Sequence, residues 1–340
     1  MNVLLTSVGR RNYMVEYFNE ALKPYNGKVY AMNSDLDASA LWVADEYVKA
    51  PLIYDPVYKN FLLDFCKTKD IQMVISLFDI ELPVLSRLKS EFQHHGISIL
   101  VGNEWLTAMA NDKWKTQMFL RQHDFETVSS YLSIVDFIFD YERGFSKYPV
   151  YVKPRWGMGS ISVFKAENEE ELRFFYKKAL KEISKTYLKF ESASDLKHSV
   201  LIQEVLPGSE YGLDVINDLQ GNYQTTVVKK KIAMRSGETD VAITVHEPIL
   251  IEIGESLGAI CKHPANMDVD VFFDGSTPYI LEINPRFGGG YPFSHAAGIN
   301  LPKAIFKWFY GEKFDVSKYL TPKIGIKAMK GISIIKEKKI

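Results

Sequence analysis

The sequence predicts an α/β domain followed by a larger α+β region, and three observations support this. Over residues 1–102, short apolar runs alternate with helical patterns, as they do in parallel α/β sheets. From about residue 150 onward, strand-like runs follow one another across Gly-, Pro- and Asp-containing turns, and residues 266–290 have the form of a β-hairpin. The chain has 340 residues, which is enough for two or three domains.

Composition limits the classes of function. The formal net charge of -1 gives no overall basic field, so we expect no nucleic-acid partner. No apolar stretch reaches the about 18 residues that a membrane helix needs, so no membrane partner is expected either. Cys66 and Cys261 are too few for a disulfide framework and lack metal-ligand spacing. Because Met1 opens no signal-peptide pattern, we expect a cytoplasmic protein.

The N-terminal part has expected strands at residues 3–5, 29–32, 73–77 and 97–101, and expected helices at 12–22 and 81–92. Ligands of parallel sheets lie beyond the carboxyl ends of the strands, where Arg10, Asp35 and Asp79 occur. Arg10 and Asp79 are therefore candidate substrate contacts, and a solvated surface position is the alternative for Arg10 and Arg11. The first turn holds a single glycine, so the dinucleotide fingerprint is missing.

The middle of the chain combines lysines with a glycine loop. A helix is expected over residues 103–122, with Lys113 inside it, and a boundary near 123–130. A strand at 150–154 carries Lys153 and leads to a loop at 155–160, with a returning strand at 161–164. Glycine backbone N–H groups can close over phosphates, with Ser160 and Lys153 as further donors. An ordinary glycine hairpin is the alternative.

Three further strands are expected at residues 200–206, 210–216 and 225–233, followed by a helix at 248–261. The first strand ends in a Pro-Gly hinge whose backbone groups suit an adenine edge, and Glu210 follows it, placed to accept from ribose hydroxyls. Alternation sends Lys229 and Lys231 to one face, where one of them is a candidate for a phosphate site. Arg235 opens a polar loop beside this strand and is a further substrate candidate.

Residues 266–290 have the form of a β-hairpin with turn residues at 274–278. Its arms alternate between an apolar set, Val269, Val271, Leu281 and Ile283, and a polar set, Asp268, Asp270, Glu282 and Asn284. Because strand side chains alternate faces, the two sets point in opposite directions. Gathered oxygen ligands suit Mg²⁺, and Arg286 follows as a fixed cation for an anionic intermediate. A hairpin with one solvated polar face is the alternative.

Taken in order, seven segments resemble the ATP-grasp superfamily: residues 6–11, 78–82, 111–113, 152–154, 157–160, 203–211 and 281–286. The last of these, Leu-Glu-Ile-Asn-Pro-Arg, is the most specific. More narrowly, the chain resembles the single-module ligases related to the carbamoyl-phosphate synthase large subunit and to the pyrrolysine-biosynthesis ligase. The resemblance covers residues 1 to about 310.

The resemblance implies roles for individual residues. Lys113 and Lys153 would bind ATP phosphates under a flap that includes Gly157, Gly159 and Ser160, and Lys153 would also act in catalysis. Glu204 and the backbone at Val205 would meet the adenine, and Glu210 the ribose. Glu282, Asn284 and either Asp268 or Asp270 would hold Mg²⁺, or Mn²⁺ in its place. Asp268 is favoured because it lies 14 residues before Glu282 (282 − 268), and Arg286 would steady an acyl phosphate.

The resemblance also implies a domain plan: a Rossmann-like pre-ATP-grasp domain at residues 1–102, then an ATP-grasp fold of two α+β subdomains at 103–310. The lid subdomain would span about 125–205, and 311–340 would be a C-terminal extension.

The implied activity is an ATP-dependent carbon–nitrogen ligase that joins a small carboxylate to an amine, with a homodimer as one possible assembly. An NAD(P)-binding oxidoreductase and a non-catalytic nucleotide-binding protein are the alternatives, because a fold alone does not decide function.

Overall fold

The computed structural model describes residues 1–157, 159 and 161–337. Its N-terminal domain is a five-stranded parallel sheet with the order β3-β2-β1-β4-β5. The strands are β1 (Asn2–Thr6), β2 (Val29–Asn33), β3 (Glu46–Lys49), β4 (Ile71–Ser76) and β5 (Ser98–Ile99). They are joined by α1 (Asn12–Leu22), α2 (Tyr58–Thr68), α3 (Leu82–His94) and the short 3-10 turns η1 (Lys23–Tyr25), η2 (Ser39–Val43) and η3 (Asp79–Glu81). The predicted parallel sheet is confirmed.

The central sheet has six strands in the antiparallel order β14-β13-β10-β11-β12-β15. They are β10 (Ser209–Asn217), β11 (Tyr223–Arg235), β12 (Glu238–Val245), β13 (Ala265–Phe273), β14 (Pro278–Asn284) and β15 (Lys327–Met329). Helix α9 (Pro248–Cys261) packs on β10 and β11. The approach is close, because a Cβ atom on Gly254 would lie 2.2 Å from the Thr226 hydroxyl.

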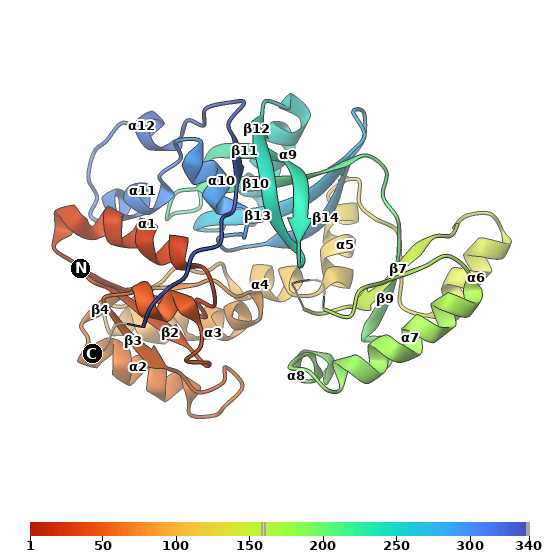
Figure 1. The fold of residues 1–340 in the computed structure, drawn as a ribbon, viewed down its shortest axis with the longest axis horizontal. Coiled ribbons are helices and arrows are strands. Elements are labelled where there is room, and N and C mark those ends of the chain that lie inside the picture. The colour runs from red at the N-terminus through yellow and green to blue at the C-terminus, as the bar shows by residue number, and fades with distance from the viewer. Residues whose placement is uncertain (158, 160, 338–340) are drawn as a thin grey trace.

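A second antiparallel sheet, with the order β6-β9-β7-β8, projects away from the body of the molecule (Figure 1). It comprises β6 (Ser130–Tyr131), β7 (Val150–Pro154), β8 (Phe164–Ala166) and β9 (Val200–Glu204). Its helices are α6 (Ile134–Glu142), α7 (Glu169–Ile183) and α8 (Leu188–Ser192), with the 3-10 turn η4 (Leu196–His198) before β9. A separate apolar core around Phe137 and Ile202 holds this unit together, and we call it the lid.

The remaining helices tie the parts together. Helices α4 (Glu104–Ala110) and α5 (Lys113–Gln122) connect the N-terminal domain to the lid. Helices α10 (Tyr291–Ala296), α11 (Leu301–Phe309) and α12 (Ser317–Leu320) follow the central hairpin and return to the N-terminal domain. There Phe18 of α1 makes edge-on ring contacts with Phe287 and Phe306. The chain thus closes its own N-terminal core with C-terminal residues.

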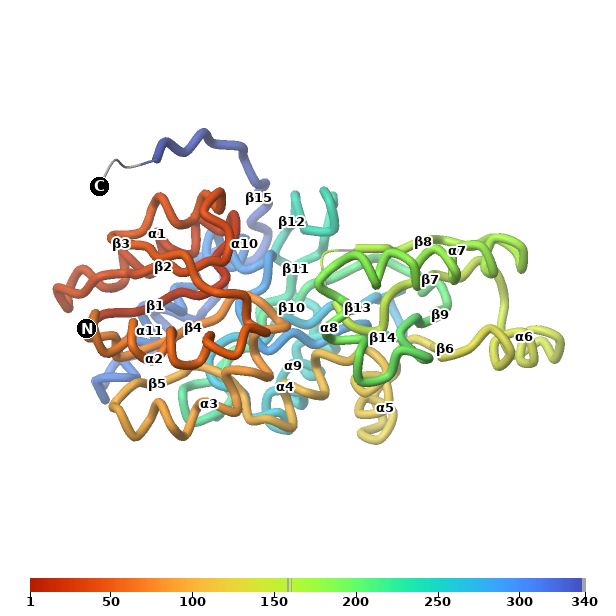
Figure 2. The backbone as a smooth tube through the Cα atoms, turned by 90° about the horizontal axis from the view of Figure 1, so that it is seen from below, coloured from red at the N-terminus to blue at the C-terminus, as the bar shows by residue number. Residues whose placement is uncertain are grey.

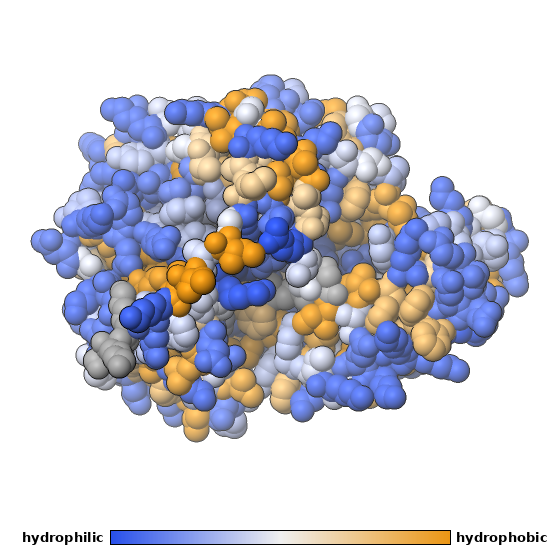
Figure 3. Space-filling model, viewed as in Figure 1, coloured by the Kyte–Doolittle hydropathy of each residue, from blue (hydrophilic) through white to orange (hydrophobic). Residues whose placement is uncertain are grey.

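The C-terminal segment after β15 runs back along the N-terminal domain (Figure 2). The Tyr47 hydroxyl donates to Glu337 at 3.3 Å, and Lys330 pairs with Glu238 at 2.9 Å. Apolar side chains on this segment are exposed, and apolar surface is visible along its path (Figure 3). Within the described part of the chain, no helix is both long and apolar enough to cross a bilayer.

Two predicted elements differ from the structure. The helix expected over residues 103–122 is two helices, because Asn111 and Asp112 interrupt it. The Asp112 side chain caps α5 by accepting from the backbone N–H groups of Trp114 and Lys115, which makes Lys113 the first helical residue. The returning strand expected at 161–164 begins only at residue 164, as β8.

Candidate functional site

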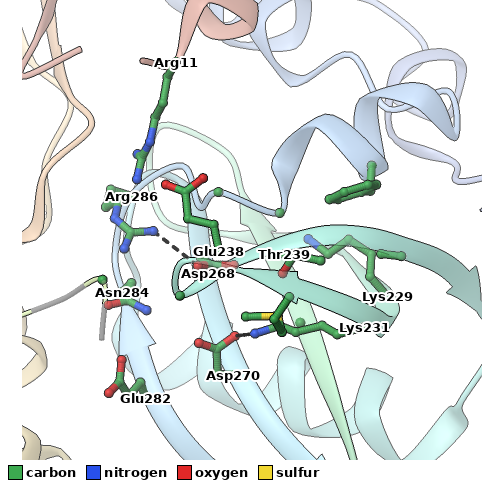
Figure 4. A pocket seen from close by; sticks show the side chains of 18 residues that line it. Arg11, Lys229, Lys231, Glu238, Thr239, Asp268, Asp270, Glu282, Asn284 and Arg286 are labelled. Carbon is green, nitrogen blue, oxygen red and sulfur yellow. Dashed lines mark hydrogen bonds and ion pairs between the residues drawn. The ribbon is translucent and has the colours of Figure 1, made fainter. Parts of the chain in front are cut away.

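Two adjoining pockets lie along the central sheet. The lid pocket, about 1170 Å³, is enclosed between the lid sheet and β10, β11, β13 and β14. The inner pocket, about 730 Å³, is bounded by the same central strands, by α10 and by Arg11 of the N-terminal domain (Figure 4). Both are lined by Gly159, Lys231, Met234, Gly237, Asp270 and Glu282. A ligand that fills one pocket therefore borders a ligand in the other.

The hairpin of β13 and β14 supplies the acidic edge between the pockets. Its register places Asp268 opposite Asn284 and Asp270 opposite Glu282, so the predicted polar face is confirmed. The prediction for Leu281 is wrong: Ile280 pairs with Val271 in the core, and Leu281 lines the lid pocket. A β-bulge beside Asp270 explains the difference, because the extra residue reverses the alternation that follows it.

Two lysines converge on Glu282 from different elements. Lys113 at the start of α5 and Lys153 on β7 each place Nζ 3.6 Å from its Oε1 atom. Burial lowers the pKa of Lys153 to about 8, although Glu282 acts in the opposite direction. Burial would raise the pKa of Glu282, but the two lysines hold it below its usual range. Cations thus gather at this edge before any nucleotide is bound.

A third lysine, Lys231 of β11, bridges two carboxylates. Its Nζ lies 2.6 Å from Glu210 and 2.5 Å from Asp270. Burial raises the pKa of Asp270 to about 6, and Lys231 opposes this rise. Burial would lower the pKa of Lys231, but Asp270 and Glu210 raise it above its ordinary value.

Arg286 joins the hairpin to the N-terminal domain. It lies 2.7 Å from Asp79 and 3.2 Å from Asp268, and it is 8% exposed. Burial would lower its pKa, but the two carboxylates raise it, so the guanidinium stays charged. Figure 4 shows Arg286 directed at Asp268 in the wall of the inner pocket. Asp79 does not line either pocket and instead holds Arg286 in place.

The inner pocket carries further charges of both signs. Arg11 donates to the backbone oxygens of Leu77 at 2.6 Å and Phe287 at 3.1 Å, which fixes its guanidinium at the pocket wall. Glu238, at the β11–β12 turn, points toward Arg11 (Figure 4). Burial would raise the pKa of Glu238, but Lys330 and Arg11 lower it. Lys229 forms an ion pair with the buried Asp214.

The lid pocket is more apolar at its far end, where Tyr151, Trp156, Ile161, Val163, Phe272 and Leu281 line it. Glu204 and Val205 lie on this wall, at the end of β9, and burial raises the pKa of Glu204. Apolar and aromatic side chains combined with convergent charged groups are typical of a small-molecule site.

Most of the residues predicted from sequence meet at these two pockets. Those that line one or both are Lys113, Lys153, Gly157, Gly159, Glu204, Val205, Glu210, Asp268, Glu282, Asn284 and Arg286. Ser160 lies outside the described residues. Arg10 is exposed, and Arg235 is exposed and paired with Asp240 at 2.9 Å, so neither lines the two pockets.

Glu238 and Arg11 also line the inner pocket, although sequence pattern predicted no site role for Glu238 and a solvated position for Arg11. Their signal was weak, since each stands beside another charged or polar residue in a turn. Only the fold shows that Arg11, rather than Arg10, turns inward. In the described residues, no three His, Cys, Asp or Glu side chains lie close enough together to hold a metal ion by themselves.

The comparisons with known proteins agree with this geometry. Residues 3–100 match a family model described as "PylC-like, N-terminal domain", and residues 197–332 match "ATP-grasp in the biosynthetic pathway with Ter operon". The carbamoyl phosphate synthase large chain of Pyrococcus furiosus is 28% identical over 167 residues, which cover 46% of this chain. The match spans only 14% of that relative's length.

Solved structures share the fold at low sequence identity. The biotin carboxylase domain of the Hydrogenobacter thermophilus 2-oxoglutarate carboxylase has a TM-score of 0.72 and 16% identity, covering 96% of this chain and 73% of that one. The Bacillus licheniformis L-amino acid ligase has a TM-score of 0.68 and 18% identity, covering 93% and 78%. The Staphylococcus aureus N5-carboxyaminoimidazole synthetase complexed with ADP has a TM-score of 0.66 and 16% identity, covering 92% and 78%. The predicted resemblance is confirmed: residues 3–100 are similar to PylC-like N-terminal domains, and residues 197–332 are similar to an ATP-grasp family.

Proposed function

We propose that the protein is an Mg²⁺- and ATP-dependent ligase that joins a small carboxylate to an amine through an acyl phosphate. One observation carries the proposal: Lys113 and Lys153 each lie 3.6 Å from Glu282, at the border that both pockets share. A triphosphate that reaches this border from the lid pocket would present its terminal phosphoryl group to a molecule in the inner pocket.

The lid pocket fits the nucleotide. Lys113 and Lys153 provide ammonium groups for the phosphates, and Gly157 and Gly159 line the pocket from the loop above. The apolar wall beside Glu204 and Val205 suits adenine, and Glu210, which also pairs with Lys231, would accept from the ribose hydroxyls.

The donor set at the acidic edge fits Mg²⁺, with Mn²⁺ as the alternative ion. Asp270 and Glu282 face each other across the hairpin, and their mutual repulsion is offset by Lys231 beside Asp270 and by two lysines beside Glu282. An Mg²⁺ ion would add to this positive charge. Two carboxylates, the Asn284 amide and phosphate oxygens make a ligand shell that this ion prefers. Both candidates for the third ligand already have a cationic partner, Asp270 in Lys231 and Asp268 in Arg286. The position opposite Glu282 on the hairpin supports Asp270. When bound, the ion would neutralise charge on the transferring phosphoryl group.

The charges of the inner pocket suit the rest of the reaction. A carboxylate oxygen of the first substrate attacks the γ-phosphorus, the bond to ADP breaks, and an acyl phosphate forms. The amine lone pair then attacks the acyl carbon, inorganic phosphate leaves, and the amine proton is released to solvent. This chemistry needs positioning and positive charge rather than a protein nucleophile. Arg286, held by Asp79, is fixed where the anionic intermediate would form.

The test is an ADP-release screen in which amino acids and other small carboxylates are each paired with amines. We expect at least one pair to release ADP in the presence of Mg²⁺, and Glu282→Gln to abolish that release. Glu312→Gln is the matched control, because Glu312 is an acidic residue whose ion pair with Lys307 lies away from both pockets.

Two outcomes would overturn the proposal in different ways. Nucleotide binding without ADP release from any pair would favour a non-catalytic nucleotide-binding protein. Nicotinamide cofactor binding in place of ATP binding would favour the oxidoreductase alternative.

A further inference from the structure

A third cavity of about 680 Å³ lies in the N-terminal domain, outside the two pockets described above. It lies at the carboxyl ends of β1, β2, β3 and β4. Phe190, on helix α8 of the lid, lines one side of it. The sheet order reverses direction between β1 and β4, and such switch points are where open α/β sheets bind ligands. We call this cavity the N-terminal pocket.

The charged residue at this switch point is Glu81, and it is fully buried. Its carboxylate accepts from Thr6 at 2.8 Å, Ser7 at 2.7 Å and Ser76 at 2.5 Å, and also from the Tyr58 hydroxyl. Ion pairs between Glu81 and any Lys, Arg or His are absent among the described residues. Buried charges are normally paired with an opposite charge. This carboxylate is instead held by neutral hydroxyl donors in the described part of the chain.

The wall of the N-terminal pocket offers nothing positive to balance this charge. Glu81 is its only charged lining residue within the described part of the chain. A second carboxylate, Glu191 of α8, stands just behind the wall and accepts from the Tyr54 hydroxyl at 2.6 Å. Glu81 is fully buried, so water screens its charge little, whereas Glu191 is partly exposed and contributes less.

Aromatic rings form much of the remaining wall. Tyr54, Tyr58 and Phe78 come from the N-terminal domain, and Tyr187 and Phe190 come from the lid. Tyr54 stacks on Phe190 with centroids 4.4 Å apart, and Phe78 meets Tyr187 edge-on at 6.0 Å. Aromatic faces attract organic cations, most strongly where water is excluded.

From the cavity, the buried carboxylate that only hydroxyl groups contact among the described residues, and the aromatic wall, we infer that the N-terminal pocket binds an organic ammonium ion with an apolar body. The ammonium group lies toward the Ser7–Tyr58–Glu81 end, and the apolar body lies between the rings of the two domains. The inner pocket is a separate site, because it is lined by different residues.

Occupation of the N-terminal pocket would also favour nucleotide binding, and this consequence rests on the proposed function. Leu188 follows Tyr187 directly and packs against Gly157, where an added Cβ atom would lie 2.5 Å from the leucine side chain. The carbonyl of Gly157 in turn accepts from Lys113. A ligand that holds Tyr187 and Phe190 against the N-terminal domain therefore holds the loop over the lid pocket, and the coupling is reciprocal.

The test uses 2-phenylethylammonium as the probe and 2-phenylethanol as a neutral molecule of similar shape, with affinities measured by calorimetry at pH 7. We expect the ammonium to bind about tenfold tighter than the alcohol, a size typical of desolvated cation–aromatic contacts. Equal affinities of the two probes, or no binding of the ammonium, would overturn the inference.

Two variants locate the bound probe. Phe190→Ala should lower the affinity for the ammonium probe several-fold. Phe174 is an exposed aromatic residue of α7 in the same lid, and Phe174→Ala should leave that affinity unchanged. Glu81→Gln should bring the two probes to similar affinity. If Glu81→Gln fails to fold, the variants Phe190→Ala and Phe174→Ala still test whether the probe binds in the N-terminal pocket. Equal affinity of these two variants for the ammonium probe would refute this site.

Nucleotide titrations separate this inference from the proposed function. Ammonium binding to a protein that binds no ATP would refute the proposed ligase and leave the N-terminal pocket standing. ATP-dependent ligation in a protein that binds no ammonium at the N-terminal pocket would support the proposed ligase and refute the inference about this pocket. When both bind, we expect the ammonium to tighten ATP binding, and Phe190→Ala to remove that effect.

Discussion

At the scale of single residues, the site is a set of buried charges that balance one another. Lys113 and Lys153 share Glu282, while Arg286 takes two carboxylates. A buried charge that loses its partner costs several kcal/mol, so removal of any one member disturbs its neighbours as well. Variants at this site therefore need matched controls and a measurement of folding.

Lys153 gives a prediction about pH. Its pKa is lowered from 10.5 to about 8 by burial, so between these values the folded protein holds fewer protons than the unfolded chain. Stability should therefore rise with pH across this window. The affinity for ATP should fall with pH across the same window, because the phosphate oxygens interact with the charged form of the Lys153 ammonium group.

The expected result is an ATP affinity that falls above about pH 8, with proton uptake on binding that calorimetry in buffers of different ionisation enthalpy detects. Lys153→Arg should remove most of this pH dependence, because arginine stays charged. An unchanged pH profile in Lys153→Arg would show that another group titrates.

The neighbouring arginines Arg10 and Arg11 give a second prediction. Arg11 lines the inner pocket and Arg10 is exposed, although the sequence favoured Arg10. Arg11→Ala should lower kcat/KM for the carboxylate–amine pair by tenfold or more, because a substrate displaced by about 1 Å can react about 10²-fold more slowly. Arg10→Ala should stay near the wild-type rate.

Steady-state kinetics on folded protein of both variants checks this. Thermal melting controls for stability, because Arg11 also contacts the carbonyls of Leu77 and Phe287. A larger loss in Arg10→Ala would restore the sequence-based choice.

At the scale of elements, local sequence predicted the long regular segments well. The helices at residues 12–22 and 248–261 agree with α1 and α9, because their apolar spacing matches the face that each one buries. The helix over 103–122 was wrong, since capping by Asp112 starts a new helix. The Leu281 face was also wrong, since a bulge depends on how two strands meet.

The site shows the same division. Glu282, Asn284 and Lys153 stand in patterned segments, and the sequence pointed to them. Arg11 and Glu238 lie in turns, where side-chain direction depends on the packing of distant segments such as residue 287 and Lys330. Periodicity carries no information about such contacts.

Helix α9 gives a prediction about packing. A Cβ atom at Gly254 would lie 2.2–2.9 Å from three side-chain atoms of Thr226 on β11, so Gly254→Ala forces the helix away from the sheet. Overpacking of this kind costs about 1–3 kcal/mol of the free energy of unfolding.

Gly331→Ala is the control, because nothing lies within 4 Å of the position that its Cβ would take. Denaturant unfolding should show the loss for Gly254→Ala and a change within about 0.5 kcal/mol for Gly331→Ala. Equal stability of the two variants would mean that α9 and β11 are less tightly packed than the structure has them.

At the scale of the whole molecule, three bodies meet at one cleft. The lid supplies Lys153 and the glycine loop, the central sheet supplies the acidic hairpin, and the N-terminal domain supplies Arg11 and Asp79. The lid has a core of its own, so it can move as a unit relative to the central sheet. A nucleotide that touches both sheets would hold them together.

This arrangement predicts that ATP stabilises the protein in a way that depends on a divalent ion. A ligand that binds only the folded state adds about 2.7 kcal/mol at a free concentration 100 times its Kd, which raises the Tm. We expect a clear rise in Tm with ATP and Mg²⁺, and a smaller one when the Mg²⁺ is chelated. In Glu282→Gln the difference between the two conditions should disappear, because the hairpin loses a ligand for the ion, whereas Glu312→Gln should keep it. If ATP raises the Tm of the unaltered protein equally with and without Mg²⁺, the acidic hairpin does not hold a nucleotide-bound ion.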